Sequence, residues 1–371
     1  MRSTRSSSRA DGAAVTASPR SARAFGLSFG TQPTGPGNSL TDVPGVRVGH
    51  VTRSDGDIQT GCTAILPHDG DLFRHKVPAA AEVINGFGKS AGLMQVQELG
   101  SLETPILLTS TFAVGTGVNA LIRQAIAANP DIGRETGTVN PVVCECNDGW
   151  LSDIQAMSLT EADMAEALDA ARSPAGVAPV PQGAVGGGTG MSCFGFKGGI
   201  GSASRRVTLD ETDYTVGLLV QANFGRAGDL VLPDGRRPKP PRTKDKAPPE
   251  RGSIIIILAT DIPLEHRQLW RVARRCGAGL ARLGAFWGHG SGDIALAFST
   301  ADRIEHDETR ALIPRSALNE SRIDLLFRAA AEGTQEAVLN ALCAATATTG
   351  RAGHFRPSLA DWLAAHPGAG S

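Results

Sequence analysis

The segment from residue 234 to residue 252 places the strongest constraint on how this chain can fold. It reads DGRRPKPPRTKDKAPPERG, in which five prolines lie among charged residues and Ala247 is the only aliphatic side chain. A segment of this composition has too little apolar surface to bury itself in a core. At Ser253 the character changes abruptly, because residues 254–258 read IIIIL. That run is too short for a helix and apolar on both faces, which predicts a fully buried strand.

Composition excludes several classes of protein. The 371 residues include 36 Lys plus Arg and 37 Asp plus Glu, for a formal net charge of -1. A nearly neutral chain has no overall attraction to nucleic acid or to an anionic membrane surface. The sequence contains no uninterrupted apolar stretch of about 18 residues, which excludes a membrane-spanning helix. We therefore expect neither nucleic acid nor a membrane as a partner.

The cysteines and the first residues indicate a cytoplasmic protein. Six cysteines are spread through the chain without the density of a disulfide scaffold, so reduced thiols are expected. Residues 1–24 are rich in Arg, Ser and Ala and contain no apolar run. They lack the apolar stretch of roughly 7 to 15 residues that a secretory signal requires, and we expect a disordered tail. A transit peptide is the alternative that this composition leaves open.

Hydrophobic patterns predict hairpins and amphipathic helices. The runs RRVTL (205–209) and YTVGLLVQA (214–222) are joined by the turn-forming DETD, which predicts a hairpin. Helices are predicted at 160–172, at 264–283 and in two pieces between 316 and 347, and further strands at 61–66, 105–109 and 294–299. The first helix has Ser158 and Glu161 at capping-box spacing, and the second has an apolar stripe of Leu269, Val272, Cys276, Leu280 and Leu283. These elements indicate an α+β fold with helices on the outer faces of sheets.

Several motif classes are missing from the sequence. The glycine-rich stretch 183–201 (GAVGGGTGMSCFGFKGGIG) contains neither a dinucleotide-binding G-x-G-x-x-G in the right context nor a phosphate loop, and the GKS at 88–90 lacks the required first glycine because Val83 stands there. We interpret these glycines as allowing tight turns and close backbone approach beside a site. The eight histidines and Cys144-x-Cys146 lack metal-ligand spacing, and no G-x-S-x-G elbow occurs. No metal and no cofactor are expected.

The junction of Gly252 and Ser253 admits two interpretations. The simpler one is a loop end that enters a strand. The other is an N-terminal nucleophile, because cleavage before Ser253 would combine an attacking hydroxyl with a free α-amine in one residue. Such an amine has an ordinary pKa of about 7.7–8.0 and can act as a base near neutral pH without a histidine.

Long blocks of sequence resemble the self-processing aminopeptidases that include the L-aminopeptidase/D-esterases and the β-peptidyl aminopeptidases. The resemblance covers nearly all of residues 27–355. The blocks, in family order, are LTDVPGVRVGHVT (40–52), VINGFGKSAGLMQVQELGSLETPILLT (83–109), ECNDGWLSDI (145–154), GAVGGGTGM, LVQANFGR (219–226), GSIIIILATDIPL (252–264) and HGSGDIALAFST (289–300). Their number and order make the resemblance specific.

This resemblance implies a fold and a processing event. The fold is an α/β/β/α four-layer sandwich of the N-terminal-nucleophile type. One precursor is cut between Gly252 and Ser253 into an α chain, residues 25–252, and a β chain, residues 253–371, of a single catalytic domain. Residues 235–250 then form a flexible, basic, Pro-rich linker at the end of the α chain. Members assemble as homo-oligomers of αβ units.

The resemblance also assigns roles to individual residues. Ser253 matches the nucleophile, and Asn223 matches the residue whose amide N–H lines the oxyanion hole. Ser291 and Asp293 match a pair that hydrogen-bonds the amine and hydroxyl of the nucleophile. Glu145 matches an acid that holds the ammonium group of the substrate. Taken singly, each residue favours a simpler role: Asn223 as the cap of a turn, Asp293 as a hairpin-turn residue and Glu145 as a solvated loop acid.

One position departs from the family pattern. Trp150 stands where family members place a tyrosine near the oxyanion or the substrate amine, and the only tyrosine of the chain, Tyr214, lies elsewhere. An indole N–H donates a hydrogen bond but does not exchange a proton near neutrality.

The Gly252-Ser253 junction and the resemblance together predict a self-cleaving aminopeptidase or amidase that acts on small peptides, amides or esters with a free amino group. A related acyltransferase, in which threonine replaces Ser253, and a non-catalytic scaffold or binding relative remain alternatives.

Overall fold

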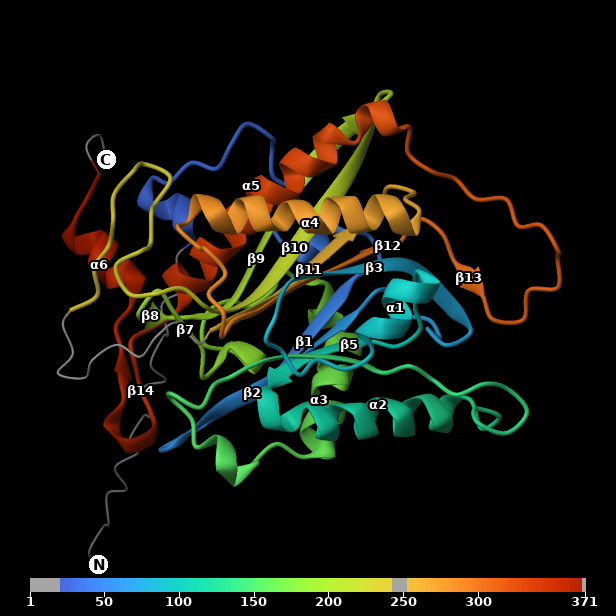
Figure 1. Cartoon of the computed structure of the whole chain (residues 1–371), viewed down its shortest axis with the longest axis horizontal. Coiled ribbons are helices and arrows are strands. Elements are labelled where there is room, and N and C mark those ends of the chain that lie inside the picture. Colours follow the sequence, from blue (N-terminus) through green and yellow to red (C-terminus); the bar gives the residue numbers. More distant parts are fainter. Residues whose placement is uncertain (1–20, 242–251, 369–371) are drawn as a thin grey trace, which may run out of the picture.

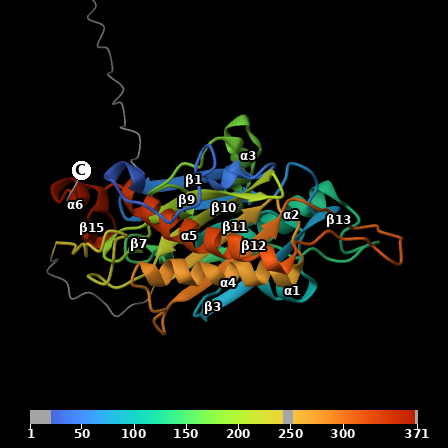
Figure 2. The ribbon, with the colours of Figure 1, turned by 90° about the horizontal axis from the view of Figure 1, so that it is seen from above.

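The computed structural model describes residues 21–241 and 252–368, and within them the chain forms four layers. Two β-sheets lie face to face. Helices α4 (His266–Arg282) and α5 (Asp324–Ala344) cover the outer face of the larger sheet, and α2 (Val114–Ala128) and α3 (Glu161–Arg172) cover that of the smaller sheet (Figure 1). Figure 2, a view from above, shows α4 and α5 on top of the strands of the larger sheet. The predicted α/β/β/α sandwich is confirmed.

The larger sheet has the strand order β13-β3-β12-β11-β10-β9, with β4 beside β3. These strands are β13 (Ile304–Glu305), β3 (His75–Gly86), β12 (Gly292–Ser299), β11 (Ser253–Thr260), β10 (Thr212–Asn223), β9 (Gly199–Leu209) and β4 (Ser101–Leu102). Strand β11 pairs antiparallel with β10 and parallel with β12. The strand that follows the Gly252-Ser253 junction is therefore central in the sheet.

The smaller sheet has the strand order β1-β2-β5-β6. These strands are β1 (Arg47–Asp55), β2 (Ile58–Leu66), β5 (Ile106–Ser110) and β6 (Val142–Cys146). Shorter elements at the ends of the two sheets are α1 (Leu93–Leu99), α6 (Leu359–Ala365), the paired strands β7 (Ser192–Cys193) and β8 (Phe196–Lys197), and the paired strands β14 (Thr348–Thr349) and β15 (Phe355–Arg356).

Strand β11 is buried on both faces, as the apolar run predicted. Ile254, Ile256 and Leu258 belong to the core between the larger sheet and the helices α4 and α5. Ile255 and Ile257 belong to the core between the two sheets. Successive side chains of a strand point to opposite faces, so a strand between two apolar layers needs apolar residues at every position.

The observed helices lie where the sequence predicted helices, and they differ from the prediction in two details. All five residues of the predicted stripe in α4 are buried. The region 316–347 contains one long helix, α5, after a short 3-10 helix at Glu320–Arg322, rather than two comparable pieces. Gly333 lets α5 approach β10 closely, because a Cβ there would lie 2.3 Å from Leu218 Cδ1. The capping box of α3 is Thr160–Asp163, not Ser158–Glu161, because Thr160 is the extended residue just before the first turn. Among the helices that the structure describes, none combines the length and apolar character needed to cross a bilayer.

The predicted hairpin is formed by β9 and β10. Leu209 pairs with Thr212, so the connection is a two-residue turn in which Asp210 and Glu211 have φ of 46° and 70°. A turn with two left-handed residues matches the twist of the flanking strands. Sequence patterns did not predict β3 and α2, because β3 contains Pro78 with three alanines and α2 contains two glycines, all poor formers of those elements.

Both segments predicted as disordered or flexible are partly ordered. Ala22 is fully buried, its backbone N–H donates to Asn340 Oδ1 at 2.8 Å, and Arg23 pairs with Glu336 at 2.6 Å, so residues 21–24 belong to the fold. The prediction for residues 1–20 lies outside the described residues. In the linker, Pro238 is buried and Arg236 pairs with Asp234 at 2.7 Å. The linker prediction for residues 242–250 also lies outside the described part.

Candidate active site

Sheet register brings four of the predicted site residues to one end of the larger sheet: Ser253, Asn223, Ser291 and Asp293. Ser253, the first residue of β11, pairs with Asn223 at the end of β10 and with Gly292 at the start of β12. Gly292 lies between Ser291 and Asp293 in the sequence. Ser253 is 4% exposed and Asn223 is 7% exposed, so the cluster lies below the surface.

The Ser253 hydroxyl lies against the preceding peptide bond. Ser253 Oγ donates to the carbonyl oxygen of Gly252 at 2.7 Å, and the backbone N–H of Gly292 lies 3.2 Å from the same oxygen. The N–H of Gly292 therefore polarises the carbonyl that the hydroxyl faces. A Cβ at position 252 would lie 2.5 Å from both Asn223 O and Phe224 Cα, so only glycine fits beside Ser253.

Ser291 and Asp293 contact each other beside Ser253. Ser291 Oγ donates to Asp293 Oδ1 at 2.7 Å, and both residues are 1% exposed. The carbonyl of Ser291 accepts hydrogen bonds from Asn85 Nδ2 and from the backbone N–H of Phe87, which ties the start of β12 to the end of β3. Asp293 lies within β12, so the hairpin-turn interpretation of this residue is wrong.

The side-chain amide of Asn223 is held at both ends. Its Oδ1 accepts from the backbone N–H of Ser192 at 2.8 Å, and its Nδ2 donates to the carbonyl of Asn147 at 2.9 Å. Ser192 lies 31 positions earlier in the chain, so Asn223 does not cap a local turn. An amide nitrogen carries two N–H groups, and among the described residues one of them donates to Asn147.

Glu145 is a buried residue of β6 and not a solvated loop acid. It is 2% exposed, and its carboxylate accepts hydrogen bonds from the backbone N–H of Lys89 at 2.8 Å and from Thr111 Oγ1. Glu145 and Ser253 line the same cavity, of about 770 Å³. Half-exposed Phe87 and Phe286 form apolar parts of its wall.

Trp150 lies outside this cavity wall as the described residues form it. Its indole stacks on the His354 ring, with 4.1 Å between ring centroids and an angle of 8°, and the Arg356 guanidinium lies 4.6 Å from its centroid. The indole is therefore enclosed by residues of the C-terminal segment. A contact between Trp150 and substrate stays a prediction.

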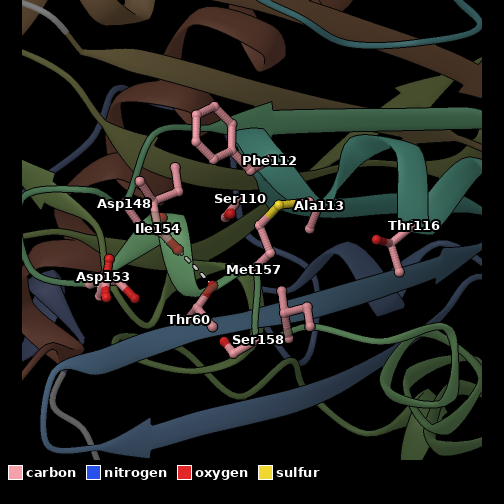
Figure 3. A pocket seen from close by; sticks show the side chains of 12 residues that line it. Thr60, Ser110, Phe112, Ala113, Thr116, Asp148, Asp153, Ile154, Met157 and Ser158 are labelled. Atoms are coloured by element: carbon pink, nitrogen blue, oxygen red, sulfur yellow. Dashed lines mark hydrogen bonds between the residues drawn. The ribbon is translucent and has the colours of Figure 1, made fainter.

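Asp148, in the loop that follows β6, lines a separate, small pocket. Its Oδ2 accepts from Thr60 Oγ1 at 2.6 Å, as Figure 3 shows, and the residue is 1% exposed. The pocket has a volume of about 10 Å³, and Phe112 and Met157 lie at its side (Figure 3). Such a volume corresponds to about one water molecule and not to a substrate. Desolvation by burial raises the pKa of Asp148 from 3.8 to about 7.

Replacement of Asp148 by asparagine is expected to change how stability depends on pH. Between pH 3.8 and 7 the folded protein retains the Asp148 proton that the unfolded chain has lost, so stability of the wild type falls as pH rises through this window, by about 4 kcal/mol at most. Asp148→Asn removes this titration and keeps an oxygen that accepts from Thr60. The melting temperatures of both proteins, measured from pH 4 to pH 8, should diverge with rising pH in favour of the variant. Exposed Asp169 provides the control, since Asp169→Asn should follow the wild type; equal slopes for Asp148→Asn would contradict the assignment.

Sequence reasoning missed three groups at the site. The backbone N–H of Gly292 and the hydroxyl of Thr111 act on groups that were predicted, and Lys89 contributes its backbone N–H to Glu145. The only sequence signals for them were the positions of Gly292 and Lys89 in the family blocks and the position of Thr111 just after the predicted strand 105–109. The six cysteines are buried, and no two of them form a disulfide. In residues 21–241 and 252–368, no three His, Cys, Asp or Glu side chains are placed to hold a metal ion.

Known proteins resemble this chain over most of its length. Residues 38–356 match the model of Peptidase family S58. The chain is 38% identical over 368 residues to the beta-peptidyl aminopeptidase BapA of Sphingosinicella microcystinivorans, covering 92% of this chain and 90% of that protein.

Two solved structures have closely similar folds. The PH0078 protein of Pyrococcus horikoshii superposes with a TM-score of 0.85 at 45% identity, covering 93% of this chain and 98% of that one. The L-aminopeptidase D-Ala-esterase/amidase of Ochrobactrum anthropi, described as a variant of the Ntn hydrolase fold, superposes with a TM-score of 0.84 at 35% identity over 93% and 96% of the two chains. The match to the family over most of the chain, together with the sandwich that carries Ser253, shows that the chain belongs to peptidase family S58 and is a serine aminopeptidase.

Proposed function

We propose that this protein cuts itself between Gly252 and Ser253 and then uses Ser253 to release amino-terminal residues from small peptides, amides or esters. The observation that carries the proposal is the contact of Ser253 Oγ with the Gly252 carbonyl, at 2.7 Å, in a cavity shared with Glu145. The relatives named as a β-peptidyl aminopeptidase and an L-aminopeptidase D-Ala-esterase/amidase support this substrate class. We further propose that the processed αβ units assemble as homo-oligomers.

The contacts of Ser253 support a route for the proposed self-cleavage. Ser253 Oγ attacks the carbonyl carbon of Gly252, and its proton passes to the nitrogen of Ser253 as the C–N bond breaks. The Gly292 N–H, 3.2 Å from the carbonyl oxygen, stabilises the negative charge that develops there. Water then hydrolyses the resulting ester, which leaves a carboxylate on Gly252 and a free hydroxyl and α-amine on Ser253.

Turnover uses the groups released by that cut. The α-amine of Ser253, with an ordinary pKa of about 7.7–8.0, takes the hydroxyl proton as Oγ attacks the substrate carbonyl. The second N–H of Asn223 donates to the developing oxyanion, and the proton goes on to the leaving amine. The contacting pair Ser291 and Asp293 orients the amine and relays its proton. Water then hydrolyses the acyl-enzyme on Ser253.

Glu145 provides the test of substrate class. Its buried carboxylate is proposed to pair with the substrate ammonium, so an amino-acid p-nitroanilide should be hydrolysed and its N-acetyl derivative should not. Glu145→Gln is expected to raise KM about tenfold or more, since a hydrogen bond between two charged groups is lost. Steady-state kinetics on both substrates measure this effect.

A matched control is Glu98→Gln, which changes an exposed glutamate of α1 and should leave KM as in the wild type. Equal hydrolysis of the free and acetylated substrates would contradict the aminopeptidase proposal. An intact mass of the purified wild type that corresponds to the whole chain would contradict the self-cleavage part.

A further inference from the structure

Lys197 is a buried lysine whose side-chain nitrogen is surrounded by backbone carbonyls. The residue is 0% exposed, and Nζ donates to the carbonyls of Gly188 at 3.0 Å, Met191 at 2.9 Å and Gly198 at 2.8 Å. An ammonium group has three N–H donors and a neutral amine has two, so three acceptors correspond to the charged form. Burial acts in the opposite direction and lowers the pKa of Lys197 to about 7.

The lysine belongs to a tight hairpin at the end of the glycine-rich stretch. Lys197 in β8 is the cross-strand partner of Ser192 in β7. The turn between them consists of Phe194 and Gly195, with φ of 51° and 81°. A two-residue turn of this kind holds its strands in a single register. The carbonyl of Met191 therefore accepts from the Lys197 side chain and from the backbone N–H of Gly198, each at 2.9 Å, while the backbone N–H of Lys197 donates to the carbonyl of Pro357 at 2.8 Å.

A continuous series of hydrogen bonds leads from this ammonium group to the oxyanion amide. Met191 O and Ser192 N–H belong to the same peptide group. Lys197 Nζ donates to that oxygen at 2.9 Å, and that N–H donates to Asn223 Oδ1 at 2.8 Å. A cation at one end of such a series polarises each group in turn and strengthens the next donor.

We propose that Lys197 is a positioning residue for turnover, which orients and polarises the Asn223 amide through the Met191–Ser192 peptide group. This inference rests on the proposed function, because it takes Asn223 as the donor to the substrate oxyanion. A lysine kept only for packing does not explain the arrangement, because an apolar side chain of the same volume avoids the desolvation of a charge.

The test compares Lys197→Met with Lys197→Arg. Methionine has a similar length but no charge or N–H donor, and it should lower kcat for an amino-terminal p-nitroanilide roughly tenfold or more, with KM within about threefold. Arginine keeps the charge and donors and should retain more of kcat. Rates are divided by the concentration of reactive Ser253 from burst titration, so a loss of folded or cut protein does not count as a loss of kcat.

A remote lysine provides the matched control. Lys76 lies at the opposite end of β3 from the site, and its Nζ also donates to a backbone carbonyl, that of Phe73, at 2.7 Å. Lys76→Met is expected to leave kcat per active site as in the wild type. An equal fall of kcat in Lys76→Met and Lys197→Met would overturn the inference.

A double-mutant cycle separates this inference from the function on which it rests. If Lys197 acts through Asn223, then adding Lys197→Met to Asn223→Ala should lower kcat little further, because residues that act as a unit are not additive. Multiplicative losses would overturn the role of Lys197 while leaving Asn223 as the oxyanion donor. No loss in Asn223→Ala alone would overturn that oxyanion assignment, and the inference with it. If Lys197→Met does not fold, the same cycle is run with Lys197→Gln, which keeps N–H donors but removes the charge.

Discussion

Replacement of Ser253 by alanine is expected to leave the chain uncut and to reduce hydrolysis to the background rate. The variant lacks the hydroxyl that faces the Gly252 carbonyl, so the peptide bond stays intact and no α-amine is released to act as base. Mass spectrometry under denaturing conditions should give one species near 38.4 kDa for the variant and two fragments for the wild type. The hydrolysis of an amino-terminal p-nitroanilide is measured on the same samples.

Ser299 provides a serine control in the same sheet. It lies at the far end of β12, is buried, and donates to the carbonyl of Ile262 at 2.7 Å. Ser299→Ala removes a buried hydroxyl without touching the junction and should still be cut at Gly252. Cleavage of Ser253→Ala at the same bond would assign processing to another nucleophile or to a contaminating protease.

Replacement of Asn223 by alanine is expected to lower kcat by about 10² to 10³, the usual effect of removing one oxyanion donor. The donor acts on charge that develops in the transition state, so KM should change much less than kcat. The measurement is steady-state kinetics per reactive Ser253. Asn319→Ala, at an exposed N-cap before residues 320–322, is the control with no expected effect on kcat.

Self-cleavage of the Asn223 variant should be slowed less than its turnover. In the uncut chain the Gly252 carbonyl accepts from the Gly292 N–H, at 3.2 Å, while Asn223 Nδ2 donates to Asn147. The rate of fragment appearance after synthesis in vitro provides this comparison. A variant that cleaves slowly and then turns over at the wild-type rate would reverse the two assignments.

Local sequence patterns correctly predicted the strands and helices whose apolar residues follow one clear pattern. The run 254–258 is apolar at every position and became the central strand β11, and the stripe of α4 is buried along its length. Both follow from periods of two or 3.6 residues, which neighbouring residues alone define. Strand β3 and helix α2 were not predicted, because their alanines and glycines show little apolar periodicity. Packing in the folded protein determines that these segments become a strand and a helix.

Composition predicted disorder less well at the ends of the N-terminal tail and of the linker. Residues 21–24 were predicted to be disordered, yet Ala22 is buried and Arg23 pairs with Glu336, a residue more than 300 positions away. The same limit applies to Pro238 in the linker, which is buried. A polar, basic segment remains ordered where the fold supplies partners, and composition does not contain those partners.

The sequence by itself determined that a fully buried strand begins directly after Gly252, because residues 254–258 are apolar at every position. It also determined the family, because several long blocks occur in one order. Only the tertiary structure decided how Asn223 is oriented, that Glu145 is buried, and that Lys197 contacts the peptide group that holds the Asn223 amide. These facts depend on strand register and on contacts between segments that are distant in the chain. Such contacts produce no repeating pattern in the local sequence, so the sequence does not predict them.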